Sequence, residues 1–128
     1  TVYLGAAVRL IDAAREAGVR RYVMISSIGA DDPAGGGEAM RPYLEAKAEA
    51  DAALEASGLD GTIVRPGPLT NDPGTGTVSA GADVGRAPIT RDDVAAVVVA
   101  ALDDPGTIGK TFVVVGGDTP IATALSQL

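Results

Sequence analysis

A tyrosine and a lysine stand four residues apart in the segment YLEAK, as Tyr43 and Lys47, and this pair could carry acid–base chemistry. On a helix, residues four apart lie on one face, with their Cβ atoms about 5 to 6 Å apart. An ammonium group at that range stabilises a phenolate, so the tyrosine could donate or accept the proton of an alcohol or a ketone. A plainer interpretation is also open, in which the tyrosine packs on a sheet and the lysine is solvated.

Two serines bring hydroxyl groups to the same region. Ser26 and Ser27 lie at the carboxyl end of the apolar run 22–26, which predicts a buried parallel strand. Open α/β sheets bind their ligands at this edge, and Tyr43 is predicted to begin the next helix there. We therefore expect a serine hydroxyl, Tyr43 and Lys47 to converge. Serines also end many strands without any function, and the sequence leaves open which of the two faces the site.

The composition excludes several kinds of site and partner. The 128 residues contain no histidine and no cysteine, which removes zinc sites, thiol nucleophiles, Ser-His-Asp triads and imidazole acid–base chemistry. Ten Lys and Arg against seventeen Asp and Glu give a net charge of −7, which argues against a nucleic-acid partner or an anionic membrane surface. Three adjacent acid pairs are interpreted as capping and loop residues, so no metal site is predicted: Asp31-Asp32, Asp92-Asp93 and Asp103-Asp104.

The elements that must position these residues alternate between helices and strands. Helices are predicted over 2–17, 42–57, 90–102 and from about 120 to the end, and strong strands over 22–26, 62–65 and 111–115, with weaker strand signals at 77–79 and at Ile89. Thr90 is the expected N-cap of the third helix. Glycine and proline predict loops over 29–40 and 66–88. Alternation of this kind predicts one α/β domain over residues 1–128, with a Rossmann-like parallel sheet and flanking helices.

The pattern opens on a helix with no strand before it, so the chain is expected to correspond to the second half of a doubly wound domain, without its N-terminal strands. Such a sheet leaves an apolar edge uncovered, which favours self-association or pairing with a partner. No segment is apolar for long enough to cross a membrane, and no signal peptide is recognisable, so a cytoplasmic location is expected.

Four segments together resemble a known family: GVRRYVMISS at 18–27, YLEAK at 43–47, SGLDGTIVRPGPL at 57–69 and ITRDDVA at 89–95. In this order they are similar to atypical short-chain dehydrogenase/reductases, most nearly the NAD(P)H-binding, NmrA-like branch. The resemblance implies NAD or NADP as cofactor and a small-molecule substrate. It also implies that Tyr43 exchanges the substrate proton, that Lys47 holds the nicotinamide ribose, and that Ser27 orients the substrate oxygen.

The same resemblance implies a cofactor-binding segment after the second strong strand. The turn at Pro66 and Gly67 would approach the nicotinamide carboxamide, with Leu69 beside it and Thr70 near the diphosphate. The expected function is an NAD(P)-dependent oxidoreductase that transfers a hydride between nicotinamide and a carbonyl-type acceptor. Two alternatives stay open: a non-catalytic NAD(P)-binding redox sensor, and a fragment that cannot bind dinucleotide alone.

The glycine-rich dinucleotide fingerprint of the family is absent from this sequence. Its nearest imitation, GTGTVS at 74–79, follows no predicted strand, opens no predicted helix and has Ser79 where the last glycine belongs. The segment Gly109-Lys110-Thr111 imitates the end of a triphosphate-binding loop but leads into a strand, so we do not expect it to bind a nucleotide triphosphate. Because the half with the fingerprint is absent, so is the acidic or basic residue that reads the ribose, and the sequence does not distinguish NAD from NADP.

Overall fold

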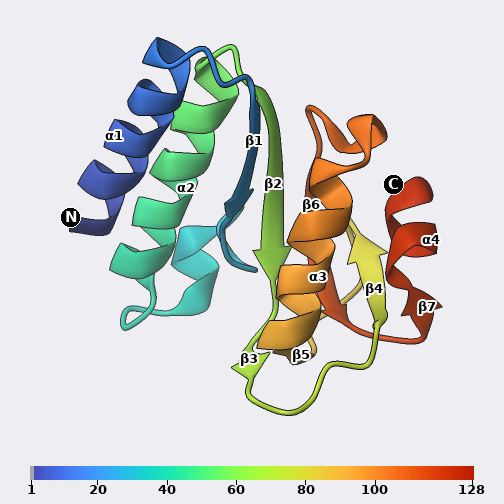
Figure 1. Cartoon of the computed structure of the whole chain (residues 1–128). Helices are drawn as coiled ribbons and strands as arrows, with labels where there is room; N and C mark the ends of the chain where they lie inside the picture. Colours follow the sequence, from blue (N-terminus) through green and yellow to red (C-terminus); the bar gives the residue numbers. More distant parts are fainter. Residues whose placement is uncertain (1) are drawn as a thin grey trace.

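The computed structural model describes residues 2–128, with side chains from Leu4 onward. Helices flank a central sheet (Figure 1). The helices are α1 (Val2–Glu16), α2 (Arg41–Ala56), α3 (Arg91–Leu102) and α4 (Ile121–Ser126), with single 3-10 turns η1 (Pro33–Gly36) and η2 (Pro105–Thr107). The strands are β1 (Arg21–Ile25), β2 (Asp60–Pro66), β3 (Leu69–Thr70), β4 (Thr77–Gly81), β5 (Ile89–Thr90), β6 (Thr111–Gly116) and β7 (Thr119–Pro120).

The main sheet has the strand order β1-β2-β6-β4-β7. β1, β2 and β6 are parallel, with Met24 opposite Ile63 and Val64 opposite Phe112. The predicted α/β class and the parallel arrangement of the three strong strands are thus confirmed. β4, however, runs antiparallel to both β6 and β7, so the sheet is mixed and not entirely parallel. The chain leaves β2 at the carboxyl edge and enters β4 from that same edge without a crossover helix (Figure 1), so β4 must run the opposite way.

The two faces of the sheet are covered by different helices. Ile63 packs with Ile11 of α1 and Leu54 of α2, whereas the next residue of β2, Val64, packs with Val97 of α3. Successive strand residues point to opposite faces, so a strand covered on both sides must be apolar at consecutive positions. This explains why β2 is apolar without alternation in the sequence.

Local chemistry sets the ends of the helices. Thr90 caps α3 as expected, because its side chain accepts a hydrogen bond from the Asp93 amide at 3.0 Å. α1 is followed by Gly18 and α2 by Gly58, with φ of 76° and 78°, values that favour glycine. At the other end of α3, the Arg21 guanidinium donates to the Ala101 carbonyl at 2.7 Å and so ties β1 to that helix.

The two predicted loops contain more structure than the sequence indicates. Residues 29–40 include the turn η1, and residues 66–88 include β3, which pairs in parallel with β5 in a second, two-stranded sheet. A pair of two-residue strands is too short to produce a periodic pattern. No helix in the described part of the chain has the length and apolar character needed to cross a membrane.

Candidate functional site

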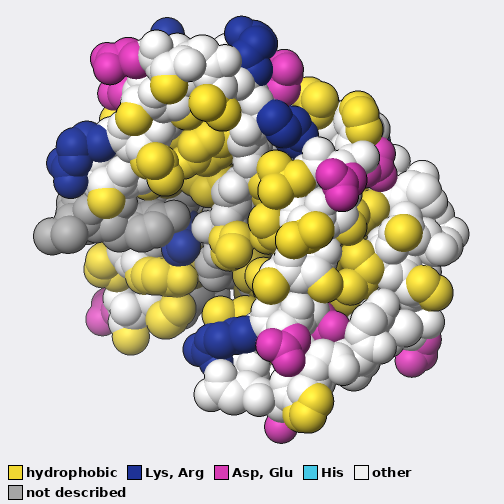
Figure 2. All heavy atoms as spheres, in the orientation of Figure 1, with side chains coloured by type: hydrophobic (Ala, Val, Ile, Leu, Met, Phe, Trp, Pro, Cys, Tyr) yellow, Lys and Arg dark blue, Asp and Glu magenta, His cyan; other side chains and the backbone are white. Residues whose placement is uncertain are grey.

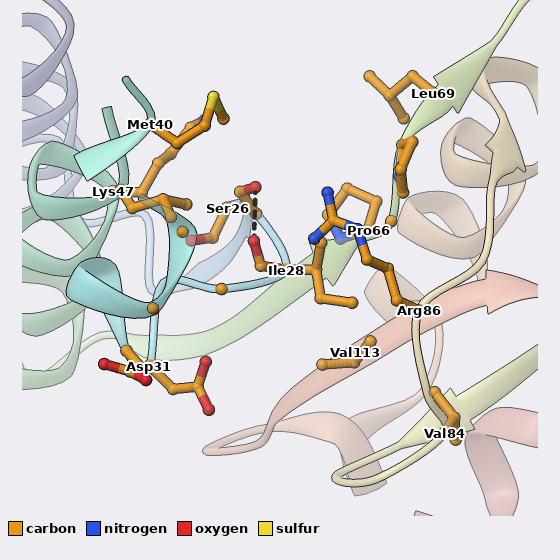
Figure 3. A pocket seen from close by; sticks show the side chains of 18 of the residues that line it. Ser26, Ile28, Asp31, Met40, Lys47, Pro66, Leu69, Val84, Arg86 and Val113 are labelled. Atoms are coloured by element: carbon orange, nitrogen blue, oxygen red, sulfur yellow. Dashed lines mark hydrogen bonds between the residues drawn. The ribbon is translucent and has the colours of Figure 1, made fainter. Parts of the chain in front are cut away.

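A cleft of about 1020 Å³ opens at the carboxyl edge of β1 and β2 (Figure 3). One wall is formed by the segment after β1, by η1 and by the first turns of α2. The floor is the turn 66–69, and the other wall is the segment 82–86 before β5. The volume is sufficient for a cofactor or small-molecule ligand.

Tyr43 and Lys47 lie at this cleft, on one face of α2. The Lys47 ammonium lies over the Tyr43 ring, with 5.5 Å between Nζ and the ring centroid. Tyr43 is 47% exposed at the rim, whereas Lys47 is only 8% exposed and donates to the Ile25 carbonyl at 3.4 Å. The Tyr43 ring is therefore open to solvent at the rim, and the positive charge against it is buried, where solvent screens it less.

The two serines have different environments. Ser26 is buried, and its hydroxyl donates to Oδ2 of Asp51 at 2.9 Å. Ser27 is half-buried at the cleft, and its hydroxyl donates to the Ile28 carbonyl at 3.0 Å. A hydroxyl that donates to a carbonyl keeps its oxygen as an acceptor and can rotate toward a ligand. Both serines line the cleft, and Ser27 is the more exposed of the two.

An ion pair that the sequence analysis did not single out lies beneath the serines. Asp51 is 2% exposed, and its Oδ2 accepts from Arg65 Nη2 at 3.0 Å and Nε at 3.2 Å as well as from Ser26. Its Oδ1 is buried without a hydrogen-bond partner among the described residues. The carboxylate thereby joins α2, β2 and the end of β1. The sequence does contain a signal for this pair. Asp51 lies on an apolar face of its helix and Arg65 lies within an apolar strand, and charges that are buried in this way occur in oppositely charged pairs.

A sequence profile of the family described as NAD(P)H-binding matches residues 3–105. The chain belongs to this family. It is 50% identical over 127 residues to the Bacillus subtilis (strain 168) protein named "Uncharacterized sugar epimerase YhfK", an alignment that covers 99% of this chain and 59% of the relative. The chain therefore spans less than two thirds of the length of that relative.

Solved structures of similar proteins have the same fold. A Bacillus halodurans protein provisionally assigned as an NAD-dependent epimerase/dehydratase superposes with a TM-score of 0.94 at 46% identity, over 99% of this chain and 60% of the other. The oxidoreductase ylbE from Lactococcus lactis gives a TM-score of 0.88 at 35% identity, over 95% of this chain and 57% of the other. The Rossmann-like architecture is thus that of the NAD(P)H-binding family.

Of the five residues expected to bind the cofactor, four line the cleft: Lys47, described above, and Pro66, Gly67 and Leu69. Pro66, Gly67 and Leu69 form its floor, whereas Thr70 is not among the lining residues and pairs with Thr90 between β3 and β5. Gly67 has a steric reason to be glycine, because a Cβ there would collide with the backbone oxygen of Ala87. The glycine therefore lets the backbone at Ala87 pack directly against the floor of the cleft.

The glycine-rich segment 74–76 has its amides already occupied. The Thr75 and Gly76 amides donate to the Asp93 carboxylate at 2.9–3.0 Å, and the Gly74 amide donates to Asp92 at 3.2 Å. Burial raises the pKa of Asp93, but the hydrogen bonds from Gly76, Thr75 and Thr90 outweigh it, so the pKa lies below its ordinary value. A carboxylate therefore already sits where a phosphate would have to bind, which is a physical reason to reject this segment as a dinucleotide fingerprint.

Proposed function

We propose that this chain carries the nicotinamide and substrate side of an NAD(P)-dependent oxidoreductase that acts on a carbonyl-type small molecule. The observation that carries the proposal is the arrangement of Tyr43 and Lys47, with a phenol at the cleft rim and a buried ammonium over its ring. The chain has no histidine or cysteine, so this tyrosine is the natural proton donor at the site.

The residues of the cleft fit the nicotinamide end of a dinucleotide. Lys47 and Ser27 offer polar groups to ribose hydroxyls and to a substrate oxygen, and Pro66, Gly67 and Leu69 offer a floor against which a ring can lie. A bound reduced nicotinamide would supply a hydride to the carbonyl carbon. The protein would supply the proton and the orientation.

Tyr43 is the group that completes the reduction. Its hydroxyl donates a proton to the carbonyl oxygen, which becomes the alcohol, and the phenolate left behind takes a proton from water at the open rim. The Lys47 ammonium stabilises that phenolate while it lasts, and the Ser27 hydroxyl hydrogen-bonds the same substrate oxygen. In the oxidation direction the phenolate accepts the proton from the alcohol.

The names of two similar proteins include epimerase activity, and the same groups would serve it. An epimerase that works by oxidation removes a hydride from the carbon and a proton from the hydroxyl of an alcohol centre. It then returns the hydride to the opposite face of the carbon and the proton to the oxygen. A reductase changes the net amount of reduced cofactor, whereas such an epimerase does not. Following both cofactor absorbance and substrate configuration therefore separates the two reactions.

Replacing Tyr43 with Phe is expected to lower kcat by about 10²- to 10⁴-fold, because the positioned proton donor is lost. The measurement is nicotinamide oxidation at 340 nm with a panel of aldehydes, ketones and quinones, using the longest polypeptide that the gene encodes. Tyr22→Phe is the matched control, since it removes a phenolic hydroxyl at the opposite end of β1 from the cleft. It should leave kcat within about twofold, well inside the effect expected for the proton donor.

Equal turnover by the wild-type protein and Tyr43→Phe on every acceptor would refute the role of Tyr43. Tight dinucleotide binding with no turnover on any acceptor would instead support the redox-sensor alternative. In that case the cofactor recovered after incubation would remain in the redox state in which it was added.

A further inference from the structure

The wall of the cleft opposite Tyr43 is anchored to the sheet. The Gly116 amide of β6 donates to the Pro88 carbonyl at 2.8 Å, and the Ile89 amide donates to the Pro68 carbonyl at 2.9 Å. The Ala87 oxygen lies against Gly67, so closely that no Cβ fits between them. Arg86 therefore projects from a segment that is fixed at the next residues along the chain.

Arg86 points into the cleft toward Ile28 (Figure 3). It is exposed, and its guanidinium has no hydrogen bond or ion pair with any residue that the structure describes. The neighbouring cleft arginine differs, because Arg91 donates to the Asn71 side chain at 2.6 Å. Arg65, beneath the cleft, pairs with the Asp51 carboxylate. Arg86 thus offers the cleft a full set of unused donors.

The acidic residues of the cleft do not neutralise this group. Asp31 and Asp32 belong to the segment after β1, on the wall opposite Arg86, and Asp83 lies three residues before it on its own wall. None of the three comes within ion-pair distance of Arg86, since the described side chains include no such pair. A ligand with a negative end would be attracted toward Arg86 and repelled from Asp31 and Asp32, which defines one orientation in the cleft.

We propose that the substrate of this cleft carries a carboxylate, which Arg86 binds while the reactive carbonyl group lies at Tyr43. A planar guanidinium matches a carboxylate with two parallel hydrogen bonds, a match that an ammonium lacks. This inference rests on the proposed function, because it names the substrate class for the same cleft. The test measures ligand binding as well as turnover, so that the carboxylate site and the oxidoreductase function can each be contradicted separately.

The probes are 4-formylbenzoate and its neutral methyl ester, which differ only in the charge opposite the aldehyde. Calorimetry or ligand-observed NMR on the longest polypeptide that the gene encodes, without cofactor, is expected to show the acid bound about tenfold more tightly. In Arg86→Gln the Kd values of the acid and the ester should lie within about twofold of each other. Added salt should weaken the preference of the wild-type protein for the acid. Arg86→Lys should retain part of the preference for the acid, because lysine keeps the positive charge but lacks the paired, planar donors of the guanidinium.

Arg41→Gln is the matched control, because it removes the same charge from a residue outside the cleft lining that pairs with Glu45. It should keep the preference, and circular dichroism should show all variants folded. A preference that survives Arg86→Gln, or that Arg41→Gln abolishes equally, would overturn the assignment.

Turnover of both probes at the same kcat/KM would likewise overturn the assignment of Arg86, while leaving the oxidoreductase function standing. The opposite result, an Arg86-dependent preference without cofactor oxidation, would support the carboxylate site and contradict the proposed reaction.

Discussion

Asp93 connects two segments that the sequence presents as unrelated. It lies in the first turn of α3, is buried, and accepts hydrogen bonds from the backbone of Thr75 and Gly76. A buried carboxylate is stable only where donors replace its hydration, and here backbone amides do so. The side chain therefore holds the segment before β4 against the start of α3.

Replacing Asp93 with Asn is expected to lower the free energy of unfolding at pH 7 by about 1–3 kcal/mol, because charge-assisted hydrogen bonds are lost. The pKa of Asp93 is lowered in the folded protein, so its contribution is present above the ordinary value of 3.8 and is lost as the pH falls through the folded value. The difference between wild type and variant should therefore narrow below about pH 4. Urea unfolding followed by circular dichroism at several pH values measures it.

Asp92→Asn serves as the control, because Asp92 is exposed and accepts a single hydrogen bond from Gly74. Its effect should be the smaller of the two at every pH. A destabilisation by Asp93→Asn that stays constant from pH 7 to pH 2 would contradict the role of its charge.

At the scale of single residues, sequence spacing predicted contacts between side chains of the same helix or strand. It did not predict contacts between side chains of different elements. Tyr43 and Lys47 share a helix face, so a four-residue spacing was enough to place them together. Asp51 and Arg65 come from a helix and a strand, and nothing in a periodic pattern says that they meet. Arg86 lies in a segment without regular structure, where no rule gives the direction of a side chain.

At the scale of elements, the contact between Gly67 and Ala87 couples the floor of the cleft to its wall. Gly67→Ala is expected to lower the free energy of unfolding by about 1–3 kcal/mol, because the new methyl group would have to displace the Ala87 backbone. Hydrogen exchange should also quicken at the Gly116 and Ile89 amides, which hold the same segment. Urea unfolding and exchange measured by NMR check the two effects.

Gly5→Ala is the matched control, since Gly5 lies in α1 and a Cβ there would meet only the flexible side chain of Arg9. It should be neutral or stabilising, by up to about 1 kcal/mol, because alanine favours the helix. Equal effects of the two substitutions would show that the approach of Ala87 to Gly67 is not rigid.

The strong elements of the fold were predictable, because each combines a clear periodicity with a chemical stop. α3, for example, has Thr90 at its start and an apolar run through Leu102. The direction of β4 was not predictable, since it depends on the path of the chain across the sheet edge and not on the residues of the strand. The pairing of β3 with β5 depends in the same way on a contact distant in sequence.

At the scale of the whole molecule, apolar side chains gather on the face that includes α3 (Figure 2). Val99 and Leu102 of α3 and Ile25 of β1 are among the exposed large apolar residues. Beyond β1 no further strand pairs within the described residues. Self-association or pairing through the uncovered sheet edge at β1 stays a prediction from the sequence.

The 128-residue chain alone is expected to bind NAD and NADP weakly or not at all. The described residues include no glycine-rich turn with free amides at a helix N-terminus, which is where a pyrophosphate normally binds, and the amides at 74–76 are occupied by Asp92 and Asp93. Isothermal calorimetry with both dinucleotides tests this. A submicromolar Kd for either one would contradict it.

The two borders of the sheet have unequal consequences for assembly. β7 is two residues long and includes Pro120, which has no amide hydrogen to donate, so that border offers almost nothing to an incoming strand. β1 presents five residues. Of the two borders in the part of the sheet that the structure describes, β1 is therefore the one that can accept a further strand, whether from the rest of a longer polypeptide or from a second copy.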